Sequence, residues 1–455
     1  MAVLALEIND SGLVAGSEDR RWQLGPGYAM LDPEGLSLGE AARSQARLRP
    51  RRLHNRFWLE LDTSPLTNPV AGAATTADLV CAQLAAQWQQ FAEDIESVVL
   101  VVPGYFASDA LGLLLGIARD CDIPVSGMVD TAVAALAGSP RGRRMLHLDA
   151  HLHLSVLTSV ECGEQVQRDQ VELVEGAGLL SLSQIWIDTV AAAFVNQTRF
   201  DPLHHAATEQ SLFDQVDGWA EVLTESSELA VQIEHQQRPI SAQLSRSQML
   251  EAAAPIYERV ARMVENAVRN HASVELAVAD RWARLPGMLD RLRAIETLRI
   301  NALAPSAALQ GALRYQQEIE SAGDEVHFIS GLPAGPAQAE PDRSPPPPSV
   351  DDGRALPTHL QLGSVIWEIT GQGLIIGSAP PGQTGVVSVG GNLQGVSRAH
   401  CRVRARDGDV VVEDQSRYGT FVNDRRIESS ASLRAGDVLR VGTPGHKLLL
   451  LEARS

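Results

Sequence analysis

The chain has 455 residues, 44% of them hydrophobic and 21% charged, and this composition predicts a globular protein of two or three domains. Its net charge of −18 argues against partners that are nucleic acids or anionic membranes. The four cysteines show no C-x-x-C spacing, which favours reduced thiols in a cytoplasmic protein. No apolar run approaches the ~20 residues that a membrane span needs.

The first 330 residues predict an α/β domain. The opening segment, Met1–Asp10, is apolar but has no basic start, so we expect a first strand and not a signal peptide. A buried strand is expected at Val98–Val102, a continuous apolar run that Pro103 ends. Apolar residues recur at every fourth position from Ile256 to Val268, which predicts a helix. Such a mixture of strands and helices is typical of an α/β body.

Several segments of this region resemble the ATPase domain of the seventy-kilodalton heat-shock chaperone family, within the actin-like superfamily. The family's "VPAYF", "NEPTAAA", "PSYV", "GDAAKNQ", "RIPKIQ" and "AVAYGAA" segments have counterparts in VVPGYF (101–106), GMVDTAVAALAG (127–138), GPGYAML (25–31), LGEAARSQARLRP (38–50), LPGMLDRL (285–292) and APSAALQGAL (304–313). Their order in the chain is that of the family. The resemblance implies a two-lobed, actin-like α/β fold for residues 1–330, with a nucleotide cleft between the lobes.

The family holds phosphates with two β-hairpins whose tips are glycines, because only a backbone without Cβ atoms can approach so closely. The first hairpin motif, D-L-G-T-T, corresponds here to Glu7–Ser11, and the second, D-L-G-G-G-T, to Asp149–His153. Both lack the glycines, and Asp10 adds a carboxylate where phosphate would lie. The resemblance also aligns the family's catalytic lysine with Asn55 and the glutamate of "NEPT" with Asp130.

These departures indicate a pseudo-ATPase body with no catalytic residue. Carboxylates beside a triphosphate cost several kcal/mol unless a cation screens them. Glu7, Asp130 and Asp149 could hold Mg²⁺ through water, so weak binding of ATP with Mg²⁺ stays open although no cofactor is expected. The sequence therefore predicts a degenerate nucleotide cleft formed by Glu7, Asp10, Asn55, Asp130 and Asp149.

Histidine and aspartate alternate from His147 to His153. On a strand, His147, Asp149, His151 and His153 would share one face, and such side chains at this spacing are plausible zinc ligands. The alternative is a hairpin with a polar face toward the cleft. No metal is assigned here.

Residues 331–356 predict a linker between two domains. The segment contains Pro333, Pro336 and Pro341, then the run Pro345–Pro348. Prolines cannot donate backbone hydrogen bonds, and little in this segment can be buried. We therefore expect an extended, semi-stiff tether.

The last domain, residues 357–455, predicts an all-β sandwich. Short apolar runs such as VVSV, CRVRA, VVVED, TFVN, VLRVG and KLLLLEA are separated by Gly, Asn and Asp. It carries 11 Lys and Arg against 9 Asp and Glu, a net charge of +2, so residues 1–356 carry −20. The two parts therefore present different electrostatic surfaces.

Three motifs in this domain resemble the forkhead-associated (FHA) domain, whose pattern is S-x-x-H, S-x-N-G-T-F-V-N and a late G-D. They are Ser397–His400, Ser416–Asn423 and Gly436-Asp437. The resemblance implies a reader of phosphothreonine. It also implies structural roles for a set of residues in the loops and strands, namely Gly377, His400, Gly419, Thr420 and Asn423.

Two positions depart from the FHA pattern. The family's phosphate-binding arginine follows a glycine, but here Ser378 follows Gly377, and Tyr418 stands in place of the recognition asparagine. A phosphate favours a guanidinium, which a neighbouring arginine could supply. We expect the phosphopeptide to contact Ser397, Arg398, Arg417 and Tyr418. Phosphothreonine reading by this altered site and phosphate-independent protein docking both stay open.

Together these patterns predict a cytoplasmic, non-catalytic adaptor that binds protein partners, some of them phosphorylated on threonine. The alternative is an ATP-dependent, chaperone-like enzyme with an altered nucleotide site. The absence of glycine from both hairpin tips favours the adaptor.

Overall fold

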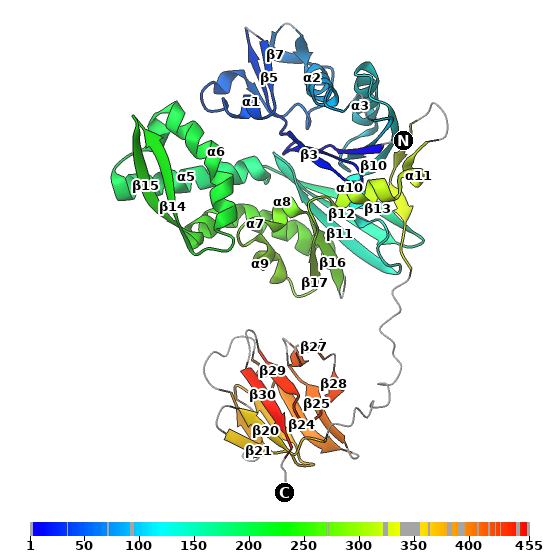
Figure 1. The fold of residues 1–455 in the computed structure, drawn as a ribbon, viewed down its shortest axis with the longest axis vertical. Coiled ribbons are helices and arrows are strands. Elements are labelled where there is room, and N and C mark those ends of the chain that lie inside the picture. Colours follow the sequence, from blue (N-terminus) through cyan, green and yellow to red (C-terminus); the bar gives the residue numbers. More distant parts are fainter. Residues whose placement is uncertain are drawn as a thin grey trace. The chain divides into compact units, whose positions relative to one another are not determined.

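The computed structural model describes residues 3–33, 35–70, 72–91, 95–269, 271, 273–321, 326–336, 355–362, 365–379, 385–389, 396–406, 409–416, 419–423, 425–427, 429–442 and 446–452. The chain divides into two compact units, Met1–Ala339 and Glu340–Ser455 (Figure 1). The first unit is mixed α/β and the second is all-β, as the sequence predicts.

The first unit is built on two six-stranded sheets. The first sheet has the order β18 (Phe328–Ile329), β10 (Val125–Asp130), β9 (Ser97–Val102), β1 (Val3–Glu7), β2 (Leu13–Gly16) and β3 (Arg21–Gly25). The second has the order β17 (Leu298–Ala302), β16 (Val274–Val278), β11 (Arg143–Ala150), β12 (Leu154–Cys162), β13 (Gln165–Glu175) and β19 (Gly331–Pro333).

The two sheets repeat one plan. In each, an antiparallel meander, β1-β2-β3 or β11-β12-β13, is extended on its first strand by parallel strands. The plan gives each sheet a hairpin turn next to its central strand, at residues 8–12 and 151–153. Both expected hairpins and the predicted strands at the N-terminus and at Val98–Val102 are therefore present.

The apolar run of β9 forms a strand because both of its faces are buried. Val98, Leu100 and Val102 pack into one core cluster, whereas Val99 and Val101 pack into another on the opposite face. The helices of this unit are α1 (Glu40–Arg43), α2 (Thr76–Trp88), α3 (Ser108–Asp120), α4 (Thr131–Leu136), α5 (Leu179–Thr198), α6 (Ala206–Val222), α7 (Arg246–Val268), α8 (Asp280–Ala283), α9 (Met288–Arg293), α10 (Ala307–Arg314) and α11 (Gln316–Ile319).

Short elements complete the first unit. They are the strands β4 (Ala29–Asp32), β5 (Gly35–Leu38), β6 (Leu53–His54), β7 (Pro65–Val70), β8 (Ala73–Thr75), β14 (Glu228–His235) and β15 (Arg238–Ser245), with 3₁₀ turns at Pro50–Arg52 and Pro202–His204. The helix predicted around Ile256–Val268 is confirmed as part of α7, and its periodic apolar residues are buried.

Helix α5 is long and apolar enough to cross a membrane by length and composition alone. The expectation that no stretch reaches this length is therefore wrong, because small and weakly polar residues among the apolar ones do not interrupt the helix. Its inner face, including Trp186, Val190 and Phe194, packs in the core with α7, and core helices of soluble proteins pass the same test.

The ordered part of the first unit extends past residue 330. Gly331–Pro333 forms β19, which pairs with β13, although we assigned these residues to the linker. Their backbone completes the edge of the second sheet, which the proline content alone did not suggest. Residues 337–354 of the predicted linker lie outside the described residues.

The second unit consists of two sheets that enclose an aliphatic core, as predicted for a sandwich. One sheet has the order β21 (Val365–Glu368), β20 (His359–Leu362), β30 (His446–Leu451), β29 (Val438–Val441), β26 (Thr420–Val422) and β27 (Arg425–Arg426). The other has the order β23 (Val386–Ser388), β22 (Leu374–Gly377), β24 (Cys401–Arg406), β25 (Asp409–Asp414) and β28 (Ser430–Ser432).

Candidate functional site

The two hairpin turns of the first unit touch each other. Asp10 Oδ1 in the first turn accepts a hydrogen bond from the backbone N of Leu152 in the second, at 2.8 Å. Asn9 Nδ2 donates to the carbonyl of Ala150 at 3.1 Å. Asn9 and Asp10 are both buried. Side chains of the first turn thus bond directly to the backbone of the second.

A buried arginine joins the carboxylates at the base of these hairpins. Arg281, in α8, donates from Nη2 to Glu7 Oε1 at 2.8 Å and from Nη1 to both carboxylate oxygens of Asp149 at 3.3 Å. Burial by itself would raise the pKa of Asp149, but Arg281 and the nearby His151 and His147 hold that pKa below its usual value. The guanidinium therefore supplies the positive charge that two buried carboxylates require.

Little space remains beside this ion cluster, which we define as Glu7, Asp149 and Arg281. The adjoining cavity measures only about 20 Å³, roughly the room that one water molecule needs. The expected set of Mg²⁺-binding carboxylates is also not assembled, because Arg281 bridges Glu7 and Asp149. The residues in this arrangement do not fit a Mg²⁺–nucleotide complex.

Asp130 and Asn55 are engaged elsewhere. Asp130 caps α4 by accepting from the backbone N of Ala132 and Val133 at 2.8 and 3.1 Å, and its other oxygen accepts from Arg168 Nη1 at 2.9 Å. The carbonyl of Asn55 lies 2.8 Å from His153 Nε2. Of the five predicted cleft residues, Glu7 and Asp149 share Arg281, and Asp10 lies in the adjacent turn.

The alternating histidines do not converge. His147 is buried, and burial lowers its pKa, so its imidazole is neutral at neutral pH. His151 Nδ1 lies 3.3 Å from Asp10 Oδ1, whereas His153 points to the Asn55 carbonyl. Among the described residues, no three His, Cys, Asp or Glu side chains are grouped so as to hold a metal ion. The zinc hypothesis has no assembled ligand set in this part of the chain.

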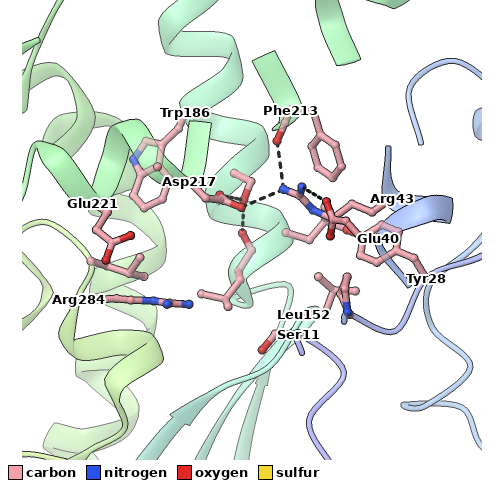
Figure 2. Close-up of a pocket in the computed structure, with 16 residues that line it drawn as sticks. Ser11, Tyr28, Glu40, Arg43, Leu152, Trp186, Phe213, Asp217, Glu221 and Arg284 are labelled. Atoms are coloured by element: carbon pink, nitrogen blue, oxygen red, sulfur yellow. Dashed lines mark hydrogen bonds and ion pairs between the residues drawn. The ribbon is translucent and has the colours of Figure 1, made fainter. Parts of the chain in front are cut away.

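Next to the hairpin turns is an open pocket of about 280 Å³, which residues of α1, α5 and α6 help to line (Figure 2). Arg43 of α1 closes one side of it by donating to the carbonyl of Phe213 and to Asp217 of α6, both at 3.2 Å. Ser183 of α5 donates to the other oxygen of Asp217 at 2.6 Å. These contacts hold α1 against α6 at the rim of the pocket.

Sequence reasoning missed Arg281 and Arg43. Glu7 and Arg281 are 274 positions apart, and no local pattern relates them. Arg281 directly follows Ala279 and Asp280, and no charge pattern in this segment points to a partner near residue 7.

In the second unit, His400 holds together the loops that contain Ser397 and Gly419. It is fully buried, its Nδ1 accepts from the backbone N of Ser397 at 3.1 Å, and its Nε2 lies 3.1 Å from the carbonyl of Gly419. Burial lowers its pKa, although the contact with Gly419 raises it in part. One imidazole thus connects the two loops that carry the recognition motifs.

The other residues with implied structural roles also lie in this region. A Cβ on Gly377 would come 2.0 Å from the carbonyl oxygen of Arg398, so only glycine fits. Thr420 is buried and donates to Asp414 Oδ1 at 2.7 Å. Asn423, at φ 49°, donates to Asp437 Oδ1 at 2.9 Å. Gly419, at φ 91°, immediately precedes β26.

The contact residues are described only in part. Ser397 is half-buried and Arg398 is exposed, whereas Arg417 and Tyr418 lie outside the described residues. The structure adds Arg426, which the sequence reasoning did not consider. A Cβ built on Gly419 would lie 2.3 Å from Arg426 Nε, so this exposed guanidinium lies against the Gly419 turn. The β26–β27 pairing, Phe421 opposite Arg426, brings it there.

Comparison with known proteins bears on the second unit. No curated protein matches the chain. Residues 374–442 match the family model of the FHA domain, which spans the strands and loops just described. Domains of this family bind phosphothreonine-containing protein partners. The C-terminal unit therefore carries an FHA domain, and this supports a role for the chain in protein–protein interaction.

Proposed function

We propose that the chain is a cytoplasmic, non-catalytic adaptor. Its body is a chaperone-type, actin-like pseudo-ATPase that binds one protein partner. Its FHA domain docks a second partner through phosphothreonine. Because one chain carries both sites, binding of one partner raises the effective concentration of the other.

The actin-like interpretation of the body rests on two observations. The motifs between residues 25 and 313 resemble those of the chaperone ATPase and follow one another in the same order along the chain. In addition, the two sheets repeat one plan and turn their hairpins toward each other, as in a fold that holds phosphates between two such turns.

The observation that carries the non-catalytic interpretation is the ion cluster. Arg281 contacts both Glu7 and Asp149, the carboxylates that would have faced a metal ion. A bound cation would have to displace this guanidinium and leave it buried and unpaired, which is strongly unfavourable. The body accordingly serves as a binding surface and not as an ATPase.

For the FHA domain, phosphate reading is supported by the cations around Ser397. Arg398 is exposed in the same loop, and Arg426 lies against Gly419, to which His400 connects the Ser397 loop. Together they can supply the guanidinium that is missing because Ser378 stands in place of the family's phosphate-binding arginine.

The test uses the full-length chain and calorimetry with matched phosphorylated and unphosphorylated peptides from a captured partner. We expect binding of the phosphothreonine form only, weakened roughly tenfold or more by Ser397→Ala or Arg426→Ala, because each charge-assisted contact is worth on the order of 1.5–3 kcal/mol. Ser432→Ala, on β28 opposite Val411, is the control and should bind as the parent does. Equal affinity for both peptide forms would leave phosphate-independent docking.

The same preparation tests the body. Incubation with Mg²⁺ and ATP should release no phosphate above a heat-inactivated sample. Steady turnover that Asp149→Ala abolishes would instead support the ATP-dependent, chaperone-like enzyme.

A further inference from the structure

A second and larger cavity, of about 630 Å³, opens in the body beside the one in Figure 2. It lies between the segment that follows α1, the first half of α5 and the middle of α7. Its walls are mainly apolar and include Leu53, Leu180, Ile185 and Ile256. A cavity of this volume with apolar walls is typical of sites for small organic ligands.

The charged residues that line this cavity are both cationic. They are Arg47 and Arg259, and no aspartate or glutamate is among the described lining residues. The neighbouring pocket of Figure 2 differs, since Glu40, Asp217 and Glu221 line it together with arginines. In a protein with a net charge of −18, a cavity with only positive charge favours an anionic ligand.

Arg259 retains capacity to bind an anion. Its guanidinium donates to two backbone carbonyls, from Nη1 to Gly176 at 3.1 Å and from Nη2 to Glu175. Arg259 forms no ion pair with another described residue, and its side chain is exposed. A guanidinium has five N–H donors, so two carbonyl contacts do not saturate it.

Arg47 contributes a second donor at the same wall. Its Nη2 donates to Gln184 at 2.6 Å and its Nη1 lies 3.5 Å from Glu209. Its guanidinium stacks on the ring of Phe213, 4.7 Å from the centroid, which holds the group in place. The Nε atom is buried and has no hydrogen-bond partner.

We infer that this cavity is a binding site for an amphipathic anion, with an apolar body between α5 and α7 and a single carboxylate or phosphate at Arg259 and Arg47. The site is separate from the adaptor role and does not depend on it. An apolar body packs against the aliphatic walls, and a small anionic head accepts hydrogen bonds from the Arg259 donors that its two carbonyl contacts do not use.

The experiment measures binding of decanoate, decyl phosphate, decanol and decyltrimethylammonium to the full chain by calorimetry, all below their micellar concentrations. Decanoate and decyl phosphate should bind, and their ratio identifies the preferred head group. Decanol and the cation should bind at least tenfold more weakly. Arg259→Met should weaken the anions at least tenfold.

Two further variants separate binding from folding. Ser181→Phe fills the cavity without touching Arg259 and should abolish binding, whereas Arg262→Met, one turn along α7 and outside the lining, should bind as the parent does. The melting temperature of each unliganded variant reports its fold. No binding of the anions, equal binding of decanol, or unchanged affinity in both Arg259→Met and Ser181→Phe would overturn the inference.

Discussion

Arg281 joins two carboxylates that lie in different sheets, Glu7 at the end of β1 and Asp149 near the end of β11. All three side chains are buried, so each charge depends on its partners for stabilisation. Removal of the cation therefore costs far more than the loss of an exposed ion pair would.

We predict that Arg281→Met lowers the free energy of unfolding of the body by about 3–5 kcal/mol, because it leaves two carboxylates buried without a countercharge. Urea unfolding followed by tryptophan fluorescence measures this change. Arg284→Met, an exposed arginine in the same segment, is the control and should change stability little. Addition of Glu7→Gln and Asp149→Asn to Arg281→Met should recover much of the loss.

The loss in free energy of unfolding that Arg281→Met causes should depend on pH. In the parent, the lowered pKa of Asp149 means that its stabilising effect is present above the ordinary carboxyl pKa of ~3.9 and is lost as pH falls through the folded value. In the variant, burial dominates and raises that pKa, so protonation stabilises the folded state as pH falls. The difference in free energy of unfolding between the parent and the variant should therefore decrease as pH falls from 7 to about 4. A gap that stays constant would contradict the ion-cluster interpretation.

Among the elements of the body, α1 depends on contacts with another helix. This helix of four residues is held at the pocket rim by contacts to α6. Arg43 bonds Phe213 and Asp217, and the backbone N of Arg47 donates to Gln210 at 2.7 Å. So short a helix has little stability of its own, and its order depends on this docking.

We predict that Arg43→Ala releases α1 from α6. Hydrogen–deuterium exchange of a peptide that covers residues 39–49 should then become roughly tenfold faster, equivalent to a loss of about 1.4 kcal/mol. Peptides from β9 should exchange at the parent rate. Arg20→Ala, an exposed arginine in the β2–β3 turn, is the control. Unchanged exchange around α1 would show that Arg43 does not hold the helix.

Local sequence patterns were sufficient to predict many helices and strands, but they could not predict which distant residues contact each other. The apolar run of β9, the four-residue period of α7 and the short strands of the second unit are visible in the sequence because each depends on neighbouring residues. The loop motifs around His400 could be placed for the same reason. The roles of Arg281, Arg43 and Arg426 could not, since each depends on which distant segment the fold brings alongside.

The two units differ as whole bodies. Met1–Ala339 carries a net charge of −18, whereas Glu340–Ser455 has a net charge of zero. The FHA domain thus lacks the long-range repulsion that the acidic body would exert on a phosphorylated partner.

We predict that limited proteolysis separates the units first. The compact units divide at Ala339–Glu340, within a proline-rich segment that has little to bury. Brief treatment with a nonspecific protease should yield two resistant fragments, which mass spectrometry should assign to cleavage between residues 337 and 354. Earlier cleavage inside either unit would contradict this division.

The identity of the cation in the ion cluster has a thermodynamic consequence. A dissociable ion occupies its site according to its free concentration, whereas the guanidinium of Arg281 is attached to the chain and cannot be diluted, chelated or exchanged. Under the proposed function, the contact between the hairpins would therefore not respond to EDTA, to magnesium supply or to the ratio of ATP to ADP. Under the proposed function, the lifetime of an assembled complex would follow the kinase and phosphatase that act on the partner's threonine, and not the energy state of the cell.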